Sequence, residues 1–319
     1  MTDAETYMRL VGDFVPDRVF DAHAHLYRVQ DLGSKAPELM GSFPETADYD
    51  TWQSGLGSVM GDQAPRGGLF FPFPGVDMDT ASANAFLAGE LASREASRRL
   101  MMIRPNDSPD SLDLDGAWSG FKVYHCFSNL PQSQDALIDQ FLPEWAWEIA
   151  HERKWAIMLH MVRQRSLADP ENTTLIAAKC KRYPGARLIL AHAARGFAGH
   201  HTAEGIENLR GLDNVYFDTS VVCEPYPLWA ILNTFGSERL LYGSDFPVSQ
   251  VRGKAITLGD GFWWLYDQSV DWSDWILGRP ALAGIESLHA LKQAAHMSDL
   301  SGTEIQRIFY DNAAELLGL

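Results

Sequence analysis

The sequence contains eight short apolar runs, most of them separated by stretches with helical spacing. These runs are residues 19–25, 68–73, 100–103, 120–124, 155–160, 187–192, 215–219 and 239–245. Continuous apolar runs are typical of strands that are buried on both faces, and parallel neighbours need long connections such as helices. The pattern therefore predicts an α/β fold in which eight parallel strands close into a (β/α)8 TIM barrel.

The length and composition of the chain fit one barrel. It has 319 residues, of which 46% are hydrophobic and 21% are charged, which is a globular composition with enough apolar material for a core. We expect a single domain over residues 1–319, with an inserted loop region at about 26–67 that is rich in glycine and proline. This insertion is either a lid over the barrel mouth or a surface excursion without a role.

The charge balance excludes several kinds of partner. The formal net charge of −16 disfavours a surface for nucleic acid or for an anionic membrane, since both require a positive field, and it favours a small-molecule partner. The three cysteines are far apart and in no Cys-x-x-Cys spacing, so we expect no disulfide framework and no thiolate metal site. Neither a signal peptide nor a membrane-spanning run is evident, which makes the cytoplasm the expected compartment.

Polar residues of metal-binding or proton-transfer type stand at the ends of five apolar runs. They are His23 and His25 on the first run, Lys122 on the fourth, His160 on the fifth, His192 on the sixth and Asp245 on the eighth. Alternate residues of a strand share a face, and the carboxyl ends of barrel strands carry the active site, so these side chains should converge. Imidazoles with a carboxylate suit a divalent ion such as zinc, or manganese if more oxygen ligands join.

Each of these residues also has a structural interpretation when it is taken alone. His160 or His192 could be a hydrogen-bonded core histidine, and Asp245 could cap the turn that follows it. The metal-site hypothesis rests on their conjunction, because independent accidents would have to place such residues at the ends of five separate runs.

Four motifs resemble the amidohydrolase superfamily, and within it the amidohydrolase 2 group of TIM-barrel hydrolases. They are Phe-Asp-Ala-His23-Ala-His25, Met-Leu-His160, Leu-Ile-Leu-Ala-His192 and Leu-Tyr-Gly-Ser-Asp245-Phe-Pro. The resemblance implies a barrel with one catalytic metal ion held by His23, His25, His160 and Asp245. It also implies that His192 lies beside the ion as an acid/base or polarising group. Members of the group include lactonases, amidohydrolases, hydratases and aromatic-acid decarboxylases.

Several cations follow strand ends and suggest a pocket for a substrate carboxylate. They are Arg28, Lys122, Arg163, Arg165 and Arg195, and Tyr124 shares a strand face with Lys122. Surface salt bridging is the alternative for Arg163 and Arg165. Lys122 also resembles the lysine that is carbamylated in two-metal members of the superfamily, although pairing with a carboxylate is the favoured interpretation.

We therefore expect a metal-dependent hydrolase that uses an activated water on a small carboxylated lactone, ester or amide, with His192 and Asp245 as the catalytic residues. The alternative is a metal-dependent decarboxylase of an aromatic or enol carboxylic acid, and a catalytically silent barrel that binds a metabolite is a further one. The aromatic segment 259–267, with Trp272 and Trp275 after it, could roof the pocket, form a contact in a homo-oligomer, or belong to the core.

Overall fold

All eight expected strand positions contain a strand. The computed structural model describes residues 1–269, 271, 273 and 280–319. The barrel strands are β1 (Asp21–His25), β4 (Gly68–Phe71), β5 (Arg98–Arg99) with β6 (Met101–Met102), β7 (Gly120–Val123), β8 (Ala156–Leu159), β9 (Arg187–Leu190), β10 (Val215–Asp218) and β11 (Leu240–Leu241). Every pair among them is parallel, as buried strands joined by helices must be.

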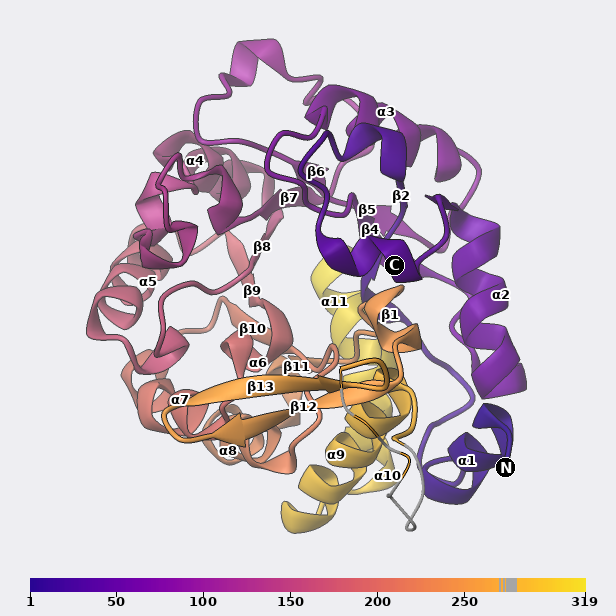
Figure 1. Ribbon diagram of the computed structural model, residues 1–319. Coiled ribbons are helices and arrows are strands. Elements are labelled where there is room, and N and C mark those ends of the chain that lie inside the picture. Colours follow the sequence, from indigo (N-terminus) through magenta and orange to yellow (C-terminus); the bar gives the residue numbers. More distant parts are fainter. Residues whose placement is uncertain (270, 272, 274–279) are drawn as a thin grey trace.

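The strands form two parallel ladders that meet at both ends. The ladders have the orders β1-β4-β5 and β11-β10-β9-β8-β7-β6. On one side they meet at Leu100, between β5 and β6, whose N–H donates to the Phe70 carbonyl at 2.9 Å. On the other side Ala22 N–H donates to the Tyr242 carbonyl at 2.8 Å, which joins β1 to the chain after β11. The fold is thus the predicted (β/α)8 TIM barrel, seen as a ring of strands inside a ring of helices in Figure 1.

Most of the helices lie around the ring of strands. They are α1 (Asp3–Leu10), α2 (Tyr49–Met60), α3 (Thr80–Glu90), α4 (Glu144–Arg153), α5 (Pro170–Arg182), α7 (Gly199–Gly205), α8 (Pro225–Phe235), α9 (Ala283–Met297) and α10 (Gly302–Gln306). Two short segments lie elsewhere: α6 (Ala191–Arg195) directly follows β9, and α11 (Asn312–Leu317) packs against the barrel interior. The sequence pattern places a helix over 135–153, but α4 begins only at Glu144 because Pro143 lacks an N–H and suits a helix start. Two short 3-10 turns precede it.

The barrel interior is filled by alternate residues of the strands. Ala156 and Met158 of β8 belong to the inner apolar cluster, whereas Ile157 and Leu159 pack against the outer helices. The C-terminal helix supplies Ala313 and Leu316 to the same inner cluster, together with Phe20, Ala22, Leu69, Phe71, Leu100, Ile189, Ala191 and Leu241. A packed interior leaves the strand ends, rather than a central pore, as the place for chemistry.

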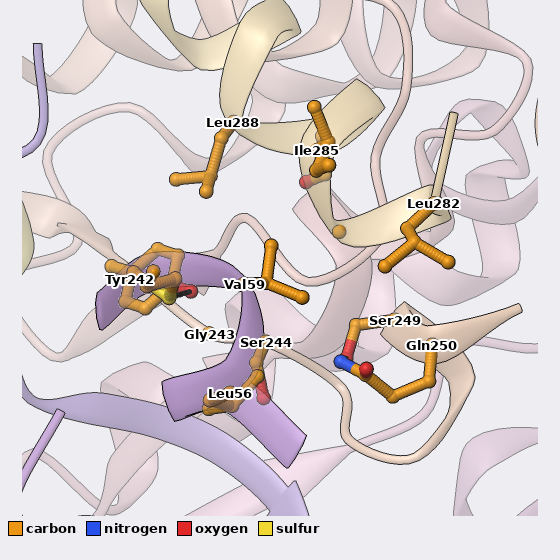
Figure 2. Close-up of a pocket in the computed structure, with 13 residues that line it drawn as sticks. Leu56, Val59, Tyr242, Gly243, Ser244, Ser249, Gln250, Leu282, Ile285 and Leu288 are labelled. Atoms are coloured by element: carbon orange, nitrogen blue, oxygen red, sulfur yellow. Dashed lines mark hydrogen bonds between the residues drawn. The ribbon is translucent and has the colours of Figure 1, made fainter. Parts of the chain in front are cut away.

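The region 26–67 is more regular than an extended loop. It contains β2 (Tyr27–Arg28) paired antiparallel with β3 (Thr46–Ala47), and then the twelve-residue helix α2. Asp48 starts α2 by accepting the Thr51 N–H at 2.8 Å. Figure 2 shows a pocket between α2, α9 and the chain around Ser244, with Leu56 and Ile285 among the apolar side chains in its walls. Most of the side chains that line this pocket are apolar.

A β-hairpin lies beside α7 and α8, outside the barrel sheet (Figure 1). It consists of β12 (Gly253–Leu258) and β13 (Gly261–Tyr266), paired antiparallel. Its inward-facing positions carry aromatic rings that contact the strand-end loops, as described below. Among the described residues, none of the helices combines the length and the apolar character that a membrane crossing requires.

The close approach of Gly120 in β7 to the backbone of Ala156 in β8 gives a test of how tightly the barrel strands pack. Gly120 has φ +149°, and a Cβ there would lie 1.8 Å from the Ala156 carbonyl oxygen in β8. We expect Gly120→Ala to lower the free energy of unfolding by about 3 kcal/mol or more, because backbone must shift. Gly211→Ala is the matched control, since Gly211 has φ +82° but open space around it, and should cost about 1 kcal/mol. Urea unfolding measures both; equal losses would contradict the steric argument.

Candidate active site

The first strand turns two histidines towards the barrel mouth through an irregularity in its pairing. The register between β1 and β4 shifts between Asp21 and Ala24. Ala22 belongs to the inner cluster and Ala24 to the outer one, so His23 and His25 lie on the inner side after the shift. Such bulges commonly re-aim side chains next to functional sites. Both histidines are almost fully buried, with exposures of 0% and 2%.

Asp245 follows β11 and meets both of these histidines. Its N–H donates to the His23 carbonyl at 2.7 Å, and its φ of 57° places it in the left-handed region. Its Oδ1 lies 3.4 Å from His23 Nε2 and 3.2 Å from His25 Nε2. Burial would raise the pKa of Asp245, but His192, His23 and His25 together hold that pKa well below its usual range. The side chain is therefore a carboxylate.

His192 and Arg195 project from one strained turn after β9. Residues 192–195 all have positive φ, from 52° to 60°, which makes α6 a left-handed turn of four residues without glycine. Each such residue costs roughly 1–2 kcal/mol, so surrounding contacts must hold the turn in place. Asp218 Oδ1 accepts the His192 N–H at 2.8 Å, and Thr202 Oγ1 donates to the Ala193 carbonyl at 2.8 Å. Backbone strain of this size is typical of functional sites.

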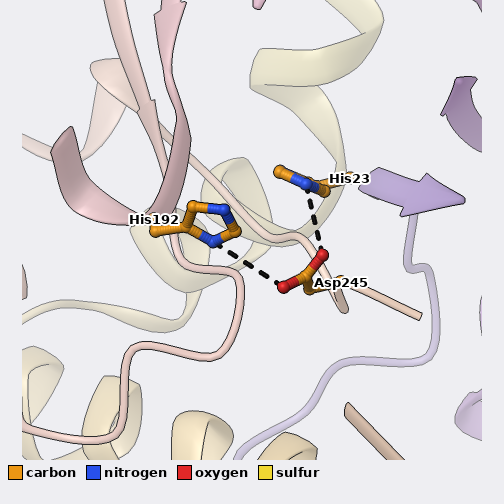
Figure 3. A group of neighbouring side chains, drawn as sticks. All are labelled: His23, His192 and Asp245. Carbon is orange, nitrogen blue, oxygen red and sulfur yellow. Dashed lines mark ion pairs between the residues drawn. The ribbon is translucent and has the colours of Figure 1, made fainter. Parts of the chain in front are cut away.

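The four expected histidines form a row. Ring centroids are 5.5 Å apart for His25 and His23, 4.8 Å for His23 and His192, and 5.2 Å for His192 and His160. Figure 3 shows His23, His192 and Asp245, whose ligand atoms all lie within 4.8 Å of one another. His192 Nδ1 is 3.8 Å from Asp245 Oδ2. His160 lies outside this group of three and next to His192.

Hydrogen bonds fix which ring nitrogen carries the proton. His25 Nδ1 lies 3.1 Å from the Pro72 carbonyl oxygen, and His160 Nδ1 lies 3.0 Å from the carbonyl oxygen of the next residue. A carbonyl can only accept, so Nδ1 is protonated and Nε2 keeps a lone pair. Burial also lowers the pKa of His25 to about 4 and that of His160 well below its usual value, which keeps both rings neutral. Neutral imidazoles are metal ligands.

Asp218, which the sequence analysis did not single out, positions two of the histidines. Its Oδ2 accepts the His23 Nδ1–H at 2.9 Å, while its Oδ1 accepts the His192 N–H. Ser220 Oγ also donates to Oδ1 and lies 3.1 Å from His23 Nδ1 and 3.0 Å from His192 Nδ1. A signal was present, because Asp218 stands near the end of the seventh apolar run, as the other candidates do on theirs.

The residues around His23 fit a divalent ion. His23 Nε2 is buried and has no hydrogen-bond partner among the described residues, which is a costly state for a polar atom. Ligands at 2.0–2.1 Å from a tetrahedral zinc ion are about 3.3 Å apart. The distances from Asp245 Oδ1 to His23 Nε2 (3.4 Å) and to His25 Nε2 (3.2 Å) match that spacing.

Lys122 and Tyr124 lie beside these histidines. Lys122 Nζ is buried without a hydrogen-bond partner in the described structure, 4.4 Å from the Phe71 ring centre and 4.7 Å from that of Tyr124. Burial lowers the pKa of Lys122 to about 7. The Tyr124 ring stacks on His160 with centroids 5.1 Å apart. The structure thus brings Lys122 and Tyr124 into the same cluster as the histidines.

The expected arginines differ in their partners. Arg28 pairs with Asp31 at 2.8 Å, Arg163 with Asp169 at 2.6 Å and Arg165 with Glu204 at 2.5 Å. Their guanidinium groups are therefore already engaged by carboxylates of the protein.

Arg195 is the exception among them. It donates to the Arg163 carbonyl at 2.8 Å and lies over the Phe262 ring, and no carboxylate of the described chain is within ion-pair distance of it. Burial lowers the pKa of Arg195, which nevertheless stays a cation. Its charge is therefore available to an anionic ligand.

The hairpin adds an aromatic wall to the site. Phe262 and Trp264 pack against Phe197 with ring centroids 5.1 Å and 5.4 Å apart, and Phe197 lies 5.4 Å from the His192 ring. The segment 259–267 therefore contacts the site through Phe197, and Phe262 and Trp264 also pack against a buried apolar cluster, as the core interpretation expects. Trp272 and Trp275 lie outside the described residues.

A TIM barrel with buried histidines and a carboxylate at the carboxyl ends of its strands is a barrel enzyme with its chemistry at the mouth. The particular family follows from comparison with known proteins: residues 20–319 match the family model of the amidohydrolases (Amidohydro_2). The chain belongs to this amidohydrolase family, and it is an enzyme of that superfamily, a hydrolase or a decarboxylase.

Individual relatives are more distant. An L-fucono-1,5-lactonase of Burkholderia ambifaria is 26% identical over 207 residues, covering 59% of this chain and 64% of that protein. The match thus spans less than two thirds of the relative. A zinc-bound amidohydrolase from Burkholderia multivorans has a TM-score of 0.64 at 16% identity, over 94% of this chain and 99% of that one. A 5-carboxyvanillate decarboxylase from Sphingomonas paucimobilis has a TM-score of 0.59 at 14% identity, over 95% and 100%. The two structures show the shared fold.

The contact between Asp218 and His23 generates a prediction. In Asp218→Asn the amide can donate to His23 Nδ1, which would move the imidazole proton to Nε2 and remove a ligand lone pair. We expect zinc affinity to fall roughly 10–100-fold, measured by titration of the metal-free protein. Asp48→Asn is the control, because asparagine is an equally good helix cap there. Unchanged affinity in a folded Asp218→Asn variant would contradict this role.

Proposed function

We propose that this amidohydrolase hydrolyses a small carboxylated lactone, ester or amide with a metal-activated water. The observation that carries the proposal is the buried His23 Nε2, which has no hydrogen-bond partner among the described residues and lies 3.4 Å from Asp245 Oδ1, a ligand-to-ligand spacing. The lactonase relative favours hydrolysis of a cyclic ester over the other reactions of the family.

The ion would be held by His23 Nε2, His25 Nε2 and an Asp245 oxygen, with His160 as the outer candidate ligand. This nitrogen-rich set favours zinc, with manganese as the alternative. A divalent ion in such a site polarises a carbonyl oxygen and lowers the pKa of water towards ~7.

The protein's own residues handle the proton. Asp245, ionised and 3.8 Å from His192 Nδ1, accepts a proton as the water oxygen attacks the carbonyl carbon. The carbonyl-to-oxygen or carbonyl-to-nitrogen bond then breaks, and the same proton passes to the leaving oxygen or nitrogen. His192, hydrogen-bonded to the Ser220 carbonyl through Nδ1, orients and polarises the reacting groups.

Substrate recognition falls to Lys122, Tyr124 and Arg195. Neither Lys122 nor Arg195 has a carboxylate within ion-pair distance in the described structure, and Tyr124 presents its ring beside Lys122. A carboxylate on the substrate would favour the charged form of Lys122 and would pair with the Arg195 guanidinium. Arg28, Arg163 and Arg165 have no such part in the proposal, because each already binds a protein carboxylate.

Decarboxylation of an aromatic or enol acid is the second candidate. The unpaired Lys122 and the aromatic surroundings of Tyr124 and Phe71 would also suit an aromatic carboxylate. The fold relative among decarboxylases makes this chemistry compatible with the barrel.

The two reactions leave different products, and both depend on the same pair of residues. We expect turnover of a lactone panel in ¹⁸O-labelled water to place the label in the product carboxylate, without release of carbon dioxide.

Asp245→Asn and His192→Asn should each lower kcat at least ~100-fold, the scale of a positioned proton-transfer group. His296→Asn, on the exposed face of α9, is the control. Full activity in both site variants would refute the mechanism, and carbon dioxide release from aromatic acids alone would favour the decarboxylase.

The guanidinium of Arg195, which has no carboxylate partner in the described structure, gives a further prediction. Arg195→Ala should raise KM for a carboxylated substrate about 10–100-fold, because a hydrogen bond to a charged group contributes roughly 1.5–3 kcal/mol. Arg163→Ala should leave KM nearly unchanged, since Asp169 and Glu171 hold that side chain. Steady-state kinetics on the substrate and on its uncharged analogue measures both effects. The reverse order of the two KM changes would overturn the assignment.

A further inference from the structure

A second group of side chains with metal-binding chemistry lies at the tip of the β12–β13 hairpin. Asp260 stands in the turn between the two strands, and His200 and His201 belong to the first turn of α7. Asp260 Oδ1 is 3.2 Å from His200 Nε2 and 3.0 Å from His201 Nε2. The three ligand atoms all lie within 4.8 Å of one another. Two imidazole nitrogens and a carboxylate oxygen thus converge from elements that are sixty residues apart.

The spacing and state of these groups suit an ion. The two nitrogen-to-oxygen distances are close to the ~3.3 Å between ligands of a tetrahedral zinc ion. His201 is only 1% exposed, so its ring is held in one position with Nε2 facing Asp260. His200 and Asp260 are partly exposed, at 28% and 54% of their side chains, which gives an ion and its remaining water ligands access from solvent.

The local charge also favours a cation. Arg165 lies 2.5 Å from Glu204 and 3.4 Å from Asp260. Two carboxylates and one guanidinium leave one net negative charge around the two imidazoles. Glu204 is on the same helix as His200, one turn further along, and pairs with Arg165 rather than with the two histidines.

From this geometry we infer that His200, His201 and Asp260 bind a further borderline divalent cation such as Zn²⁺, separate from the one at the barrel mouth. The ion holds the hairpin tip against α7. Nitrogen ligands exclude hard ions such as Mg²⁺, which prefer an all-oxygen octahedral shell.

The position of the cluster gives the ion a structural consequence for the site. An isolated two-stranded hairpin is marginally stable. The base and middle of this one are attached to the barrel, for example by Thr257, whose N–H and Oγ1 contact Glu224 at 2.9 Å and 2.5 Å, and by Lys254, which lies 3.4 Å from Glu286. The inner face of the hairpin carries Phe262 and Trp264, which pack on Phe197 beside His192. An ion at the tip therefore stabilises the aromatic wall of the active site.

Zinc titration of the metal-free full-length protein tests the inference. We expect the wild type to bind one more equivalent of Zn²⁺ than Asp260→Asn or His201→Ala, and Mg²⁺ to give no binding at this cluster. Asparagine still accepts a hydrogen bond from an imidazole but lacks the charge, so Asp260→Asn separates ion binding from the neutral contact. His296→Ala, an exposed histidine on α9 outside both clusters, is the matched control and should keep the wild-type stoichiometry.

A second readout follows the hairpin itself. Zinc should slow hydrogen exchange of the amides in 253–266 in the wild type but not in Asp260→Asn. His23→Ala separates this site from the barrel mouth, because it should lose the mouth equivalent and keep the hairpin one. Wild-type stoichiometry in both Asp260→Asn and His201→Ala would overturn the inference. Loss of an equivalent in Asp260→Asn supports it, whatever His23→Ala does.

Discussion

The buried carboxylate of Asp218 is the interaction on which the site depends. It accepts hydrogen bonds from the His23 ring on the first strand and from the backbone N–H of His192 after the sixth. The Ser220 N–H donates a further hydrogen bond to the same carboxylate. Burial would raise the pKa of Asp218, but His23, His192 and Ser220 outweigh that effect and hold it at about 2. A fully satisfied buried network is rigid, so one carboxylate sets the separation between the two histidines. Asp245 then completes the cluster from the eighth strand.

The candidate site contains basic side chains, although the chain as a whole is strongly acidic. The protein carries a formal net charge of −16, yet the buried Lys122 and the half-buried Arg195 have no carboxylate within ion-pair distance in the described structure. Basic groups without such a partner are costly to enclose and tend to be kept where function requires them. The acidic surface disfavours large anions such as nucleic acid, while the local cations favour a small anionic ligand.

Much of the fold and part of the site could be predicted from local sequence. The apolar runs gave the eight strands, and the polar residue types at their ends gave His23, His25, Lys122, His160, His192 and Asp245. The predicted helix over 135–153 began too early, because the helical spacing of apolar residues extends before Pro143, which immediately precedes the actual start of α4. The sequence could not show which arginines are engaged by protein carboxylates and which are available to a ligand. Arg28 and Arg163 pair with carboxylates, whereas Arg195 lacks such a partner only because of the tertiary surroundings in which it lies.

The sequence by itself determined the barrel and which of its strands end in imidazoles and a carboxylate, because strand periodicity and residue type are local properties. The tertiary structure decided how those groups meet. The shift in β1 turned His23 and His25 inward, and a left-handed turn aimed His192 and Arg195. The contact between His23 and Asp218 joins residues 195 positions apart, and no local pattern encodes such a contact before the strands close into a ring.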